Sequence, residues 1–227
     1  MKKYYFRELI LGSMILVFSS NGIAEIKPYI EGQMNYVNPD NVSTATYSGT
    51  VSGITFNGVK MDEEYDNDTT AGFEIGLNGV AQNIRLGFSY MEPEFKLDKA
   101  TLTGSITDGV TTLSGSVGLT SADFASVGVT VDNDVKVYML NAYYDFDASE
   151  KLKPFIGFGL GMSDIENAED KELTYAAMAG AKYYIQKNVY LGGKFTYATI
   201  NGPKDKLGVD YEDIDFYTAT VALGYEF

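Results

Sequence analysis

The stretch FYTATVALGYEF, residues 216–227, decides the fold. Its odd-numbered positions form an apolar series from Tyr217 to Phe227, whereas its even-numbered positions are mostly small or polar. Side chains of a β-strand point alternately to the two faces of a sheet, so a period of two residues predicts a strand with one apolar face.

Seven further segments upstream show the same alternation, and together they predict an all-β domain of eight strands. A chain of 227 residues fits one such domain. The other candidate strands are residues 26–37, 70–77, 84–93, 135–146, 153–162, 172–185 and 189–200.

Charged residues within these segments fall on the face opposite the bulky apolar residues. Arg85, for example, stands between Ile84 and Leu86. A cation on the lipid face of a membrane barrel costs about 2–4 kcal/mol near the midplane, so charges should point into the barrel interior. A water-soluble sandwich would point the same charges outward, and periodicity alone does not separate the two folds.

The lengths of the connections separate them. Short connections alternate strictly with connections that are mostly longer. This alternation places all the long loops at one end of the sheet. This is typical of a transmembrane antiparallel up-and-down β-barrel with short periplasmic turns, and an even strand number puts both termini on the periplasmic side. The short connections are residues 78–83, 147–152 and 186–188; the longer ones are 38–68, 95–134, 163–171 and 201–213.

The N-terminal residues predict a cleaved secretory signal peptide. A basic start precedes the apolar segment 9–18, and Gly22 and Ala24 occupy the small-residue positions before a cleavage site. We therefore expect residues 1–24 to be removed and residues 25–227 to form the outer-membrane β-barrel domain.

Composition excludes several kinds of function. The predicted mature chain has 14 basic and 30 acidic residues, so nucleic acid is not an expected partner. Without histidine or cysteine the chain lacks the commonest general base and the usual ligands of zinc and copper. We predict a non-enzyme with no catalytic, cofactor-binding or metal site, whose abundant carboxylates are solvated loop charge.

Two stretches resemble a known family. LNAYYDF at 140–146, followed by KPFIGFGLG at 153–161, is similar to the central hairpin of opacity-type and OmpA-like eight-stranded barrels. The ending GYEF resembles the C-terminal signature of these porin-like proteins. The resemblance implies the outer membrane of a Gram-negative bacterium, contact with its lipid and lipopolysaccharide, and assembly machinery that reads Tyr225 and Phe227.

The charges predicted to face the lumen form the candidate site: Glu31, Glu74, Arg85, Lys182 and Lys194. An eight-stranded barrel is just wide enough for its side chains to fill, and buried charges need partners. We expect a cross-lumen network that plugs the barrel, with Glu74 and Arg85 as its best pair. The alternative is a wet lumen in which these charges line a narrow ion path.

The long loops carry the remaining expectations. Asn57-Gly58 and Asp108-Gly109 are strong tight-turn signals and predict strand extensions or small hairpins above the membrane. The acids of residues 62–68 could bind divalent cations, but solubility and mutual repulsion are the simpler reading. We expect a surface protein that displays long acidic extracellular loops and has either an adhesin-type or antigen-type interaction role or a membrane-structural role. An extracellular or host ligand would bind at loops 38–68 and 95–134. The alternative is a small porin-like channel for ions or small solutes.

Overall fold

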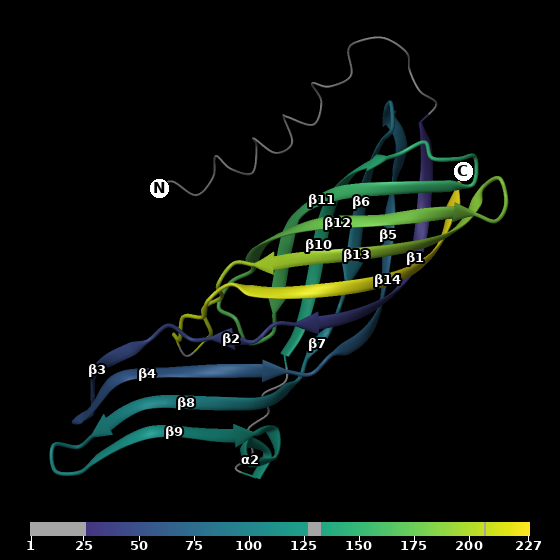
Figure 1. Ribbon diagram of the computed structural model, residues 1–227. Coiled ribbons are helices and arrows are strands. Elements are labelled where there is room, and N and C mark those ends of the chain that lie inside the picture. The colour runs from purple at the N-terminus through teal and green to yellow at the C-terminus, as the bar shows by residue number, and fades with distance from the viewer. Residues whose placement is uncertain (1–25, 127–132, 207) are drawn as a thin grey trace, which may run out of the picture.

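The computed structural model describes residues 26–126, 133–206 and 208–227, and it shows a barrel with a separate sheet projecting from one end (Figure 1). The predicted signal peptide, residues 1–24, lies outside the described residues. In the described part of the chain, no helix has the length and apolarity needed to cross a membrane.

Eight antiparallel strands form the closed barrel, which confirms the predicted fold class. Each strand pairs with its neighbours in barrel order, and β14 pairs back with β1, with Glu226 opposite Tyr29 at one end and Phe216 opposite Pro39 at the other. The barrel strands are β1 (Lys27–Pro39), β5 (Asp68–Ala81), β6 (Ile84–Met91), β10 (Asn133–Asp145), β11 (Leu152–Ile165), β12 (Glu172–Tyr184), β13 (Val189–Ile200) and β14 (Ile214–Glu226).

The barrel is apolar outside and charged inside, the reverse of a water-soluble fold. On β14 the outward side chain of Val221 is 66% exposed, whereas the inward side chain of Glu226 is buried. On β5 Ile75 is exposed, and its neighbour Glu74 is 0% exposed. An outer surface of this kind is stable against lipid rather than water, so the alternation locates the two faces as the sequence predicts.

Adjacent aromatic residues near the short turns divide between these two faces. Tyr144 and Tyr183 are exposed on the outside, where an amphipathic ring suits a membrane interface. Tyr143 is buried, and Tyr184 donates a hydrogen bond to Glu226. Only one tyrosine of each adjacent pair can therefore belong to an interfacial belt.

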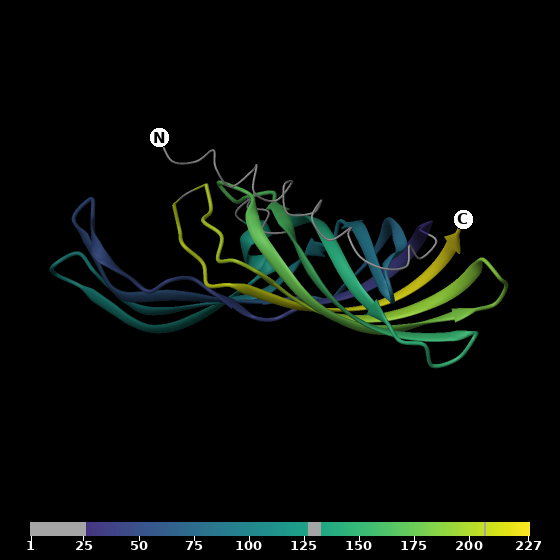
Figure 2. The same cartoon turned by 90° about the horizontal axis from the view of Figure 1, so that it is seen from above.

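The two longest loops form one sheet together rather than separate hairpins. We call β2, β3, β4, β8 and β9 the projecting sheet; in Figures 1 and 2 it extends away from the barrel end opposite the short turns. Its central pairing joins β4 of the first loop to β8 of the second. Its strands are β2 (Val42–Ser43), β3 (Tyr47–Val51), β4 (Ile54–Tyr65), β8 (Leu97–Thr107) and β9 (Thr112–Thr120); the short strand β7 (Glu94–Phe95) precedes β8, and the helix α2 (Ser121–Ser126) follows β9.

One predicted turn is wrong and the other is confirmed. Asn57-Gly58 lies within β4, where Gly58 has a φ of 59° beside a register shift against β8. The hairpin turns instead at Ser52 and Gly53, both of which have positive φ, as a two-residue hairpin turn requires. Pairing with β8 explains the difference, because β4 must continue past Asn57 and a bulge absorbs its glycine. Asp108-Gly109 does turn, between β8 and β9.

Candidate functional site

Seven ionisable side chains meet inside the barrel, on the half nearer the short turns. We call them the lumen ion cluster. It contains all five residues that the sequence predicts for the lumen and two more, Asp145 and Glu226. Its members are Glu31, Glu74, Arg85, Asp145, Lys182, Lys194 and Glu226.

Arg85 is the centre of the lumen ion cluster. Its Nη1 lies 3.2 Å from Oε1 of Glu74 and 3.9 Å from Oε1 of Glu31, and its Nε lies 3.2 Å from Oδ2 of Asp145. The guanidinium carbon stands 3.8 Å from the ring centroid of Tyr143. One cation thus joins carboxylates from three strands, and a planar guanidinium has enough donors to do so.

Glu74 is fully buried and accepts hydrogen bonds from several sides. The hydroxyl groups of Tyr29 and Tyr143 donate to it at 2.6 and 2.7 Å, and Nδ2 of Asn141 donates at 3.1 Å. Nζ of Lys194 lies 3.4 Å from its Oε2. A buried carboxylate needs this many partners to offset the loss of its hydration.

Lys182 joins the two carboxylates that the sequence analysis did not identify. Its Nζ lies 3.3 Å from Oδ2 of Asp145 and 3.4 Å from Oε1 of Glu226. Separately, Glu31 accepts a hydrogen bond of 2.7 Å from the hydroxyl of Tyr190. The cluster therefore combines four carboxylates with three cations, and tyrosines supply further donors.

The alternation rule could have found both missed residues. Asp145 stands between Tyr144 and Phe146 and points inward, as Arg85 does between its apolar neighbours. Glu226 stands likewise between Tyr225 and Phe227. What the rule could not supply is the set of contacts, because these depend on how the strands are staggered around the closed barrel.

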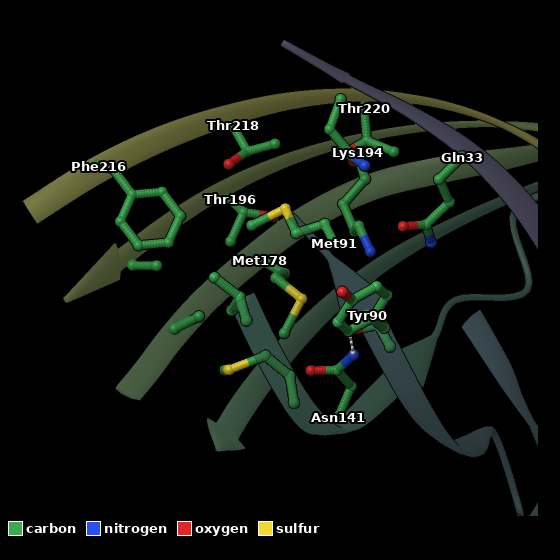
Figure 3. A pocket seen from close by; sticks show the side chains of 16 residues that line it. Gln33, Tyr90, Met91, Asn141, Met178, Lys194, Thr196, Phe216, Thr218 and Thr220 are labelled. Atoms are coloured by element: carbon green, nitrogen blue, oxygen red, sulfur yellow. Dashed lines mark hydrogen bonds between the residues drawn. The ribbon is translucent and has the colours of Figure 1, made fainter. Parts of the chain in front are cut away.

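Little open space remains around the lumen ion cluster. A cavity beside Arg85 and Lys182 measures about 10 Å³, roughly the room for one water molecule. A second cavity of about 40 Å³ lies next along the barrel, between Gln33, Asn141 and Lys194 (Figure 3). These dimensions favour an interior filled by side chains over a continuous water path.

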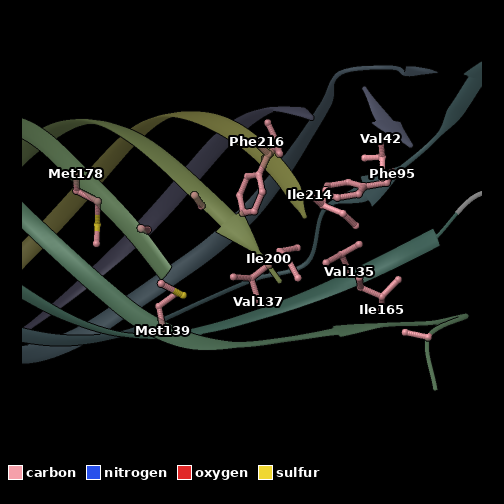
Figure 4. Packing of buried hydrophobic residues seen from close by; sticks show 14 of the residues in the cluster. Val42, Phe95, Val135, Val137, Met139, Ile165, Met178, Ile200, Ile214 and Phe216 are labelled. Carbon is pink, nitrogen blue, oxygen red and sulfur yellow. The ribbon is translucent and has the colours of Figure 1, made fainter. Parts of the chain in front are cut away.

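Apolar side chains close the other half of the lumen, beyond the charged residues that the sequence predicts for the interior. We call them the mouth cluster, and Figure 4 shows them where the strands reach the long loops. In the sequence these inward apolar residues alternate with charged ones: Val135 and Val137 flank Lys136, and acids flank Ile165 and Ile214. The alternation at these strand ends therefore has the sense opposite to that of the half that holds the lumen ion cluster. The mouth cluster consists of Val42, Phe95, Val135, Val137, Ile165, Ile200, Ile214 and Phe216.

The acids of residues 62–68 do not converge on one point. Asp62 lies 3.2 Å from Nζ of Lys60, and Glu64 lies 3.4 Å from Nζ of Lys99, while Glu63 between them points to the buried side of β4. Across residues 26–126, 133–206 and 208–227, no group of three or more acidic side chains is placed to hold a metal ion.

The outer edge of the projecting sheet is a bare strand. Within the described residues β9 pairs only with β8, so its other edge presents unpaired backbone groups. Residues 112–120 include no charged residue and no proline, the features that normally protect such an edge. Leu113 and Val117 are exposed along it.

Comparisons with known proteins agree with the barrel fold. Residues 11–227 match the family described as outer membrane protein beta-barrel domain. Outer membrane protein PagN of Salmonella typhimurium is 27% identical over 111 residues, which are 41% of this chain and 46% of PagN, so the match spans less than half of that relative. Protein opa of Haemophilus influenzae is 25% identical over 118 residues, 47% of this chain and 92% of opa. The crystal structure of Neisserial surface protein A has a similar fold, with a TM-score of 0.53, 11% identity, and coverage of 88% of this chain and 97% of that one.

Replacing Arg85 by alanine should destabilise the barrel strongly, because it leaves Glu74, Glu31 and Asp145 buried together without their shared cation. Breaking a buried ion pair from one side costs about 3–5 kcal/mol. Urea unfolding of the refolded chain in micelles measures the change. Lys136→Ala is the matched control, since it removes a cation from an exposed pair with Glu92 and should cost at most about 1 kcal/mol. Equal stability of the Arg85→Ala and native proteins would contradict the central role of Arg85.

The native chain should give no steady conductance in a planar lipid bilayer, because the lumen ion cluster and the mouth cluster fill successive halves of the lumen. A heat-dependent gel shift of the same sample establishes that the protein is folded. Reproducible conductance steps from folded protein would show an open lumen and favour the ion-path alternative.

Proposed function

Because this chain belongs to the outer membrane protein β-barrel domain family, we propose that it is a surface interaction protein whose barrel anchors the projecting sheet outside the cell. It resides in the outer membrane of a Gram-negative bacterium, as its relatives do. The short turns lie on the periplasmic side, and the long loops are extracellular.

The observation that carries this proposal is the exposed edge of β9. An extended segment of a partner protein can add to such an edge as one more strand, with main-chain hydrogen bonds for affinity and side-chain contacts for specificity. The long pairing of β4 with β8 holds the edge in place and carries it away from the barrel. The ligand is therefore a protein segment in extended conformation, of extracellular or host origin.

The interior supports an anchor rather than a channel or an enzyme. Buried ion pairs and apolar packing fill the lumen, and both hold the barrel rigid beneath the loops. The chain has no histidine or cysteine to serve as a general base or a nucleophile. We accordingly assign it no catalytic role.

Lysine substitutions on the edge strand should abolish binding without affecting the barrel. Leu113→Lys and Val117→Lys place charges along β9, and an edge lysine opposes strand addition. Cells that display the native chain should adhere to cultured host cells, and cells that display either variant should lose most of this adherence at equal surface level.

Ile54→Lys is the matched control, because Ile54 is also exposed but belongs to β4, which is paired on both sides. Adherence by this variant should equal that of the native chain. Loss of adherence in all three variants would indicate a general charge effect, and retention in all three would exclude the β9 edge.

The terminal aromatic residues offer a separate test of assembly. We propose that assembly machinery in the cell reads Tyr225 and Phe227, whose rings lie 5.0 Å apart on the outer face. Phe227→Ala should refold in micelles as the native chain does, yet reach the outer membrane at a much lower level in cells. Val221→Ala is the control, because Val221 and Phe227 are both 66% exposed. Equal surface levels of the two variants would rule out recognition of Phe227 by the assembly machinery.

A further inference from the structure

A large pocket lies above the mouth cluster, where the projecting sheet joins the barrel. We call it the mouth pocket. Its volume is about 520 Å³, within the range of small-molecule sites. Phe95 and Ile214, which Figure 4 shows in the mouth cluster, also line this pocket. The other residues used in the argument are Glu63, Tyr65, Asp205 and Tyr211.

Glu63 is the unusual member of this lining. Glu63 is only 8% exposed. The residues opposite it on the two adjacent strands, Val42 and Ala100, are apolar and buried. The hydroxyl groups of Tyr65 and Tyr211 hydrogen-bond to its carboxyl group. Within the described residues, no lysine or arginine forms an ion pair with it.

A charge of the same sign acts on Glu63. Burial raises the pKa of Glu63, and the negative charge of Asp205 raises this pKa further, against the hydrogen bonds from the two tyrosines. The carboxylate of Asp205 accepts a hydrogen bond from the backbone N–H of Val209. Lys206 also lines the pocket, but its Nζ donates to the carbonyl oxygen of Glu166.

This combination has a definite chemical preference. A buried carboxylate beside a second carboxylate gains most from a cation, and the gain is large because little water competes for it. Aromatic rings next to the carboxylate favour an organic ammonium ion through cation–π attraction. The apolar remainder of the lining favours a ligand that also carries an apolar group.

We propose that the mouth pocket binds an organic ammonium ion with an apolar substituent. Its charged nitrogen lies against Glu63 and faces the rings of Tyr65 and Tyr211. Its apolar part covers Phe95 and Ile214 at the floor. The site is separate from the β9 edge, so its test does not depend on the proposed function.

The probe is 2-phenylethylammonium chloride, titrated calorimetrically into the folded full chain in a non-ionic detergent and an amine-free buffer. Saturable binding is expected, and the neutral 2-phenylethanol should bind at least about tenfold more weakly because it lacks the charge. Titration into empty micelles corrects for partition of the probe into detergent. No saturable binding, or equal binding of the alcohol, would overturn the proposal.

Glu63→Gln should weaken binding of the ammonium probe by at least about tenfold, because the amide keeps the shape and removes the charge. Glu64→Gln is the matched control one residue along β4, where the side chain points the other way and pairs with Lys99; its affinity should be unchanged. Equal affinity in the two variants would contradict the role of Glu63, and displacement of the probe by calcium chloride would indicate an inorganic cation site instead.

The native chain gives an independent readout if Glu63→Gln fails to fold. The facing titratable groups are Tyr65, Asp205, Lys206 and Tyr211, and both tyrosine pKa values are raised by burial. The carboxyl of Glu63 becomes neutral as the pH falls through its raised pKa. Probe affinity should therefore fall as the buffer is changed from neutral to acidic, and an affinity that stays constant through this change would overturn the proposal.

Discussion

The pairing of β14 with β1 is the constraint on which the rest of the molecule depends. A backbone polar group left unpaired in hydrocarbon costs several kcal/mol, so a sheet that crosses a membrane must have no free edge. Pairing along the whole length of both strands removes that edge. In the closed barrel each side chain of a strand points either toward lipid or toward the lumen. Residues that alternate along the sequence therefore alternate between the outer and the inner face of the barrel.

The inside is narrow, and two kinds of packing fill it. Near the short turns the lumen ion cluster holds strands together through Arg85, whose three carboxylate partners come from β1, β5 and β10. Near the long loops the mouth cluster does so through apolar contact. The ionic half fixes the register between the strands, because a shift in register would separate a buried charged group from its partner, and an unpaired buried charge is costly. The apolar half lies where the strands reach the long loops.

Outside the membrane, in contrast to the barrel, the chain leaves a sheet edge free. The barrel has none, whereas the projecting sheet ends in the uncharged strand β9. A free edge is acceptable there because water can satisfy its backbone groups until a partner strand replaces the water. The same two loops that build this sheet also bring Glu63 of β4 over the mouth cluster, beside Asp205 from the last long loop. One arrangement of loops thus creates both the edge proposed to bind a protein segment and the pocket proposed to bind an ammonium ion.

Sequence alone determined the eight barrel strands, their faces and the nearness of Glu74 to Arg85, because alternation and short turns are local properties. Residues two apart share a face wherever the strand lies, and a short turn fixes its two neighbours. Only the tertiary structure decided that β4 pairs with β8, that Asn57-Gly58 therefore becomes a bulge, and that Glu63 is buried beneath the loops. It also decided which carboxylates Arg85 meets on strands distant in the chain. These outcomes depend on the register between segments far apart in sequence, and no local pattern encodes that register.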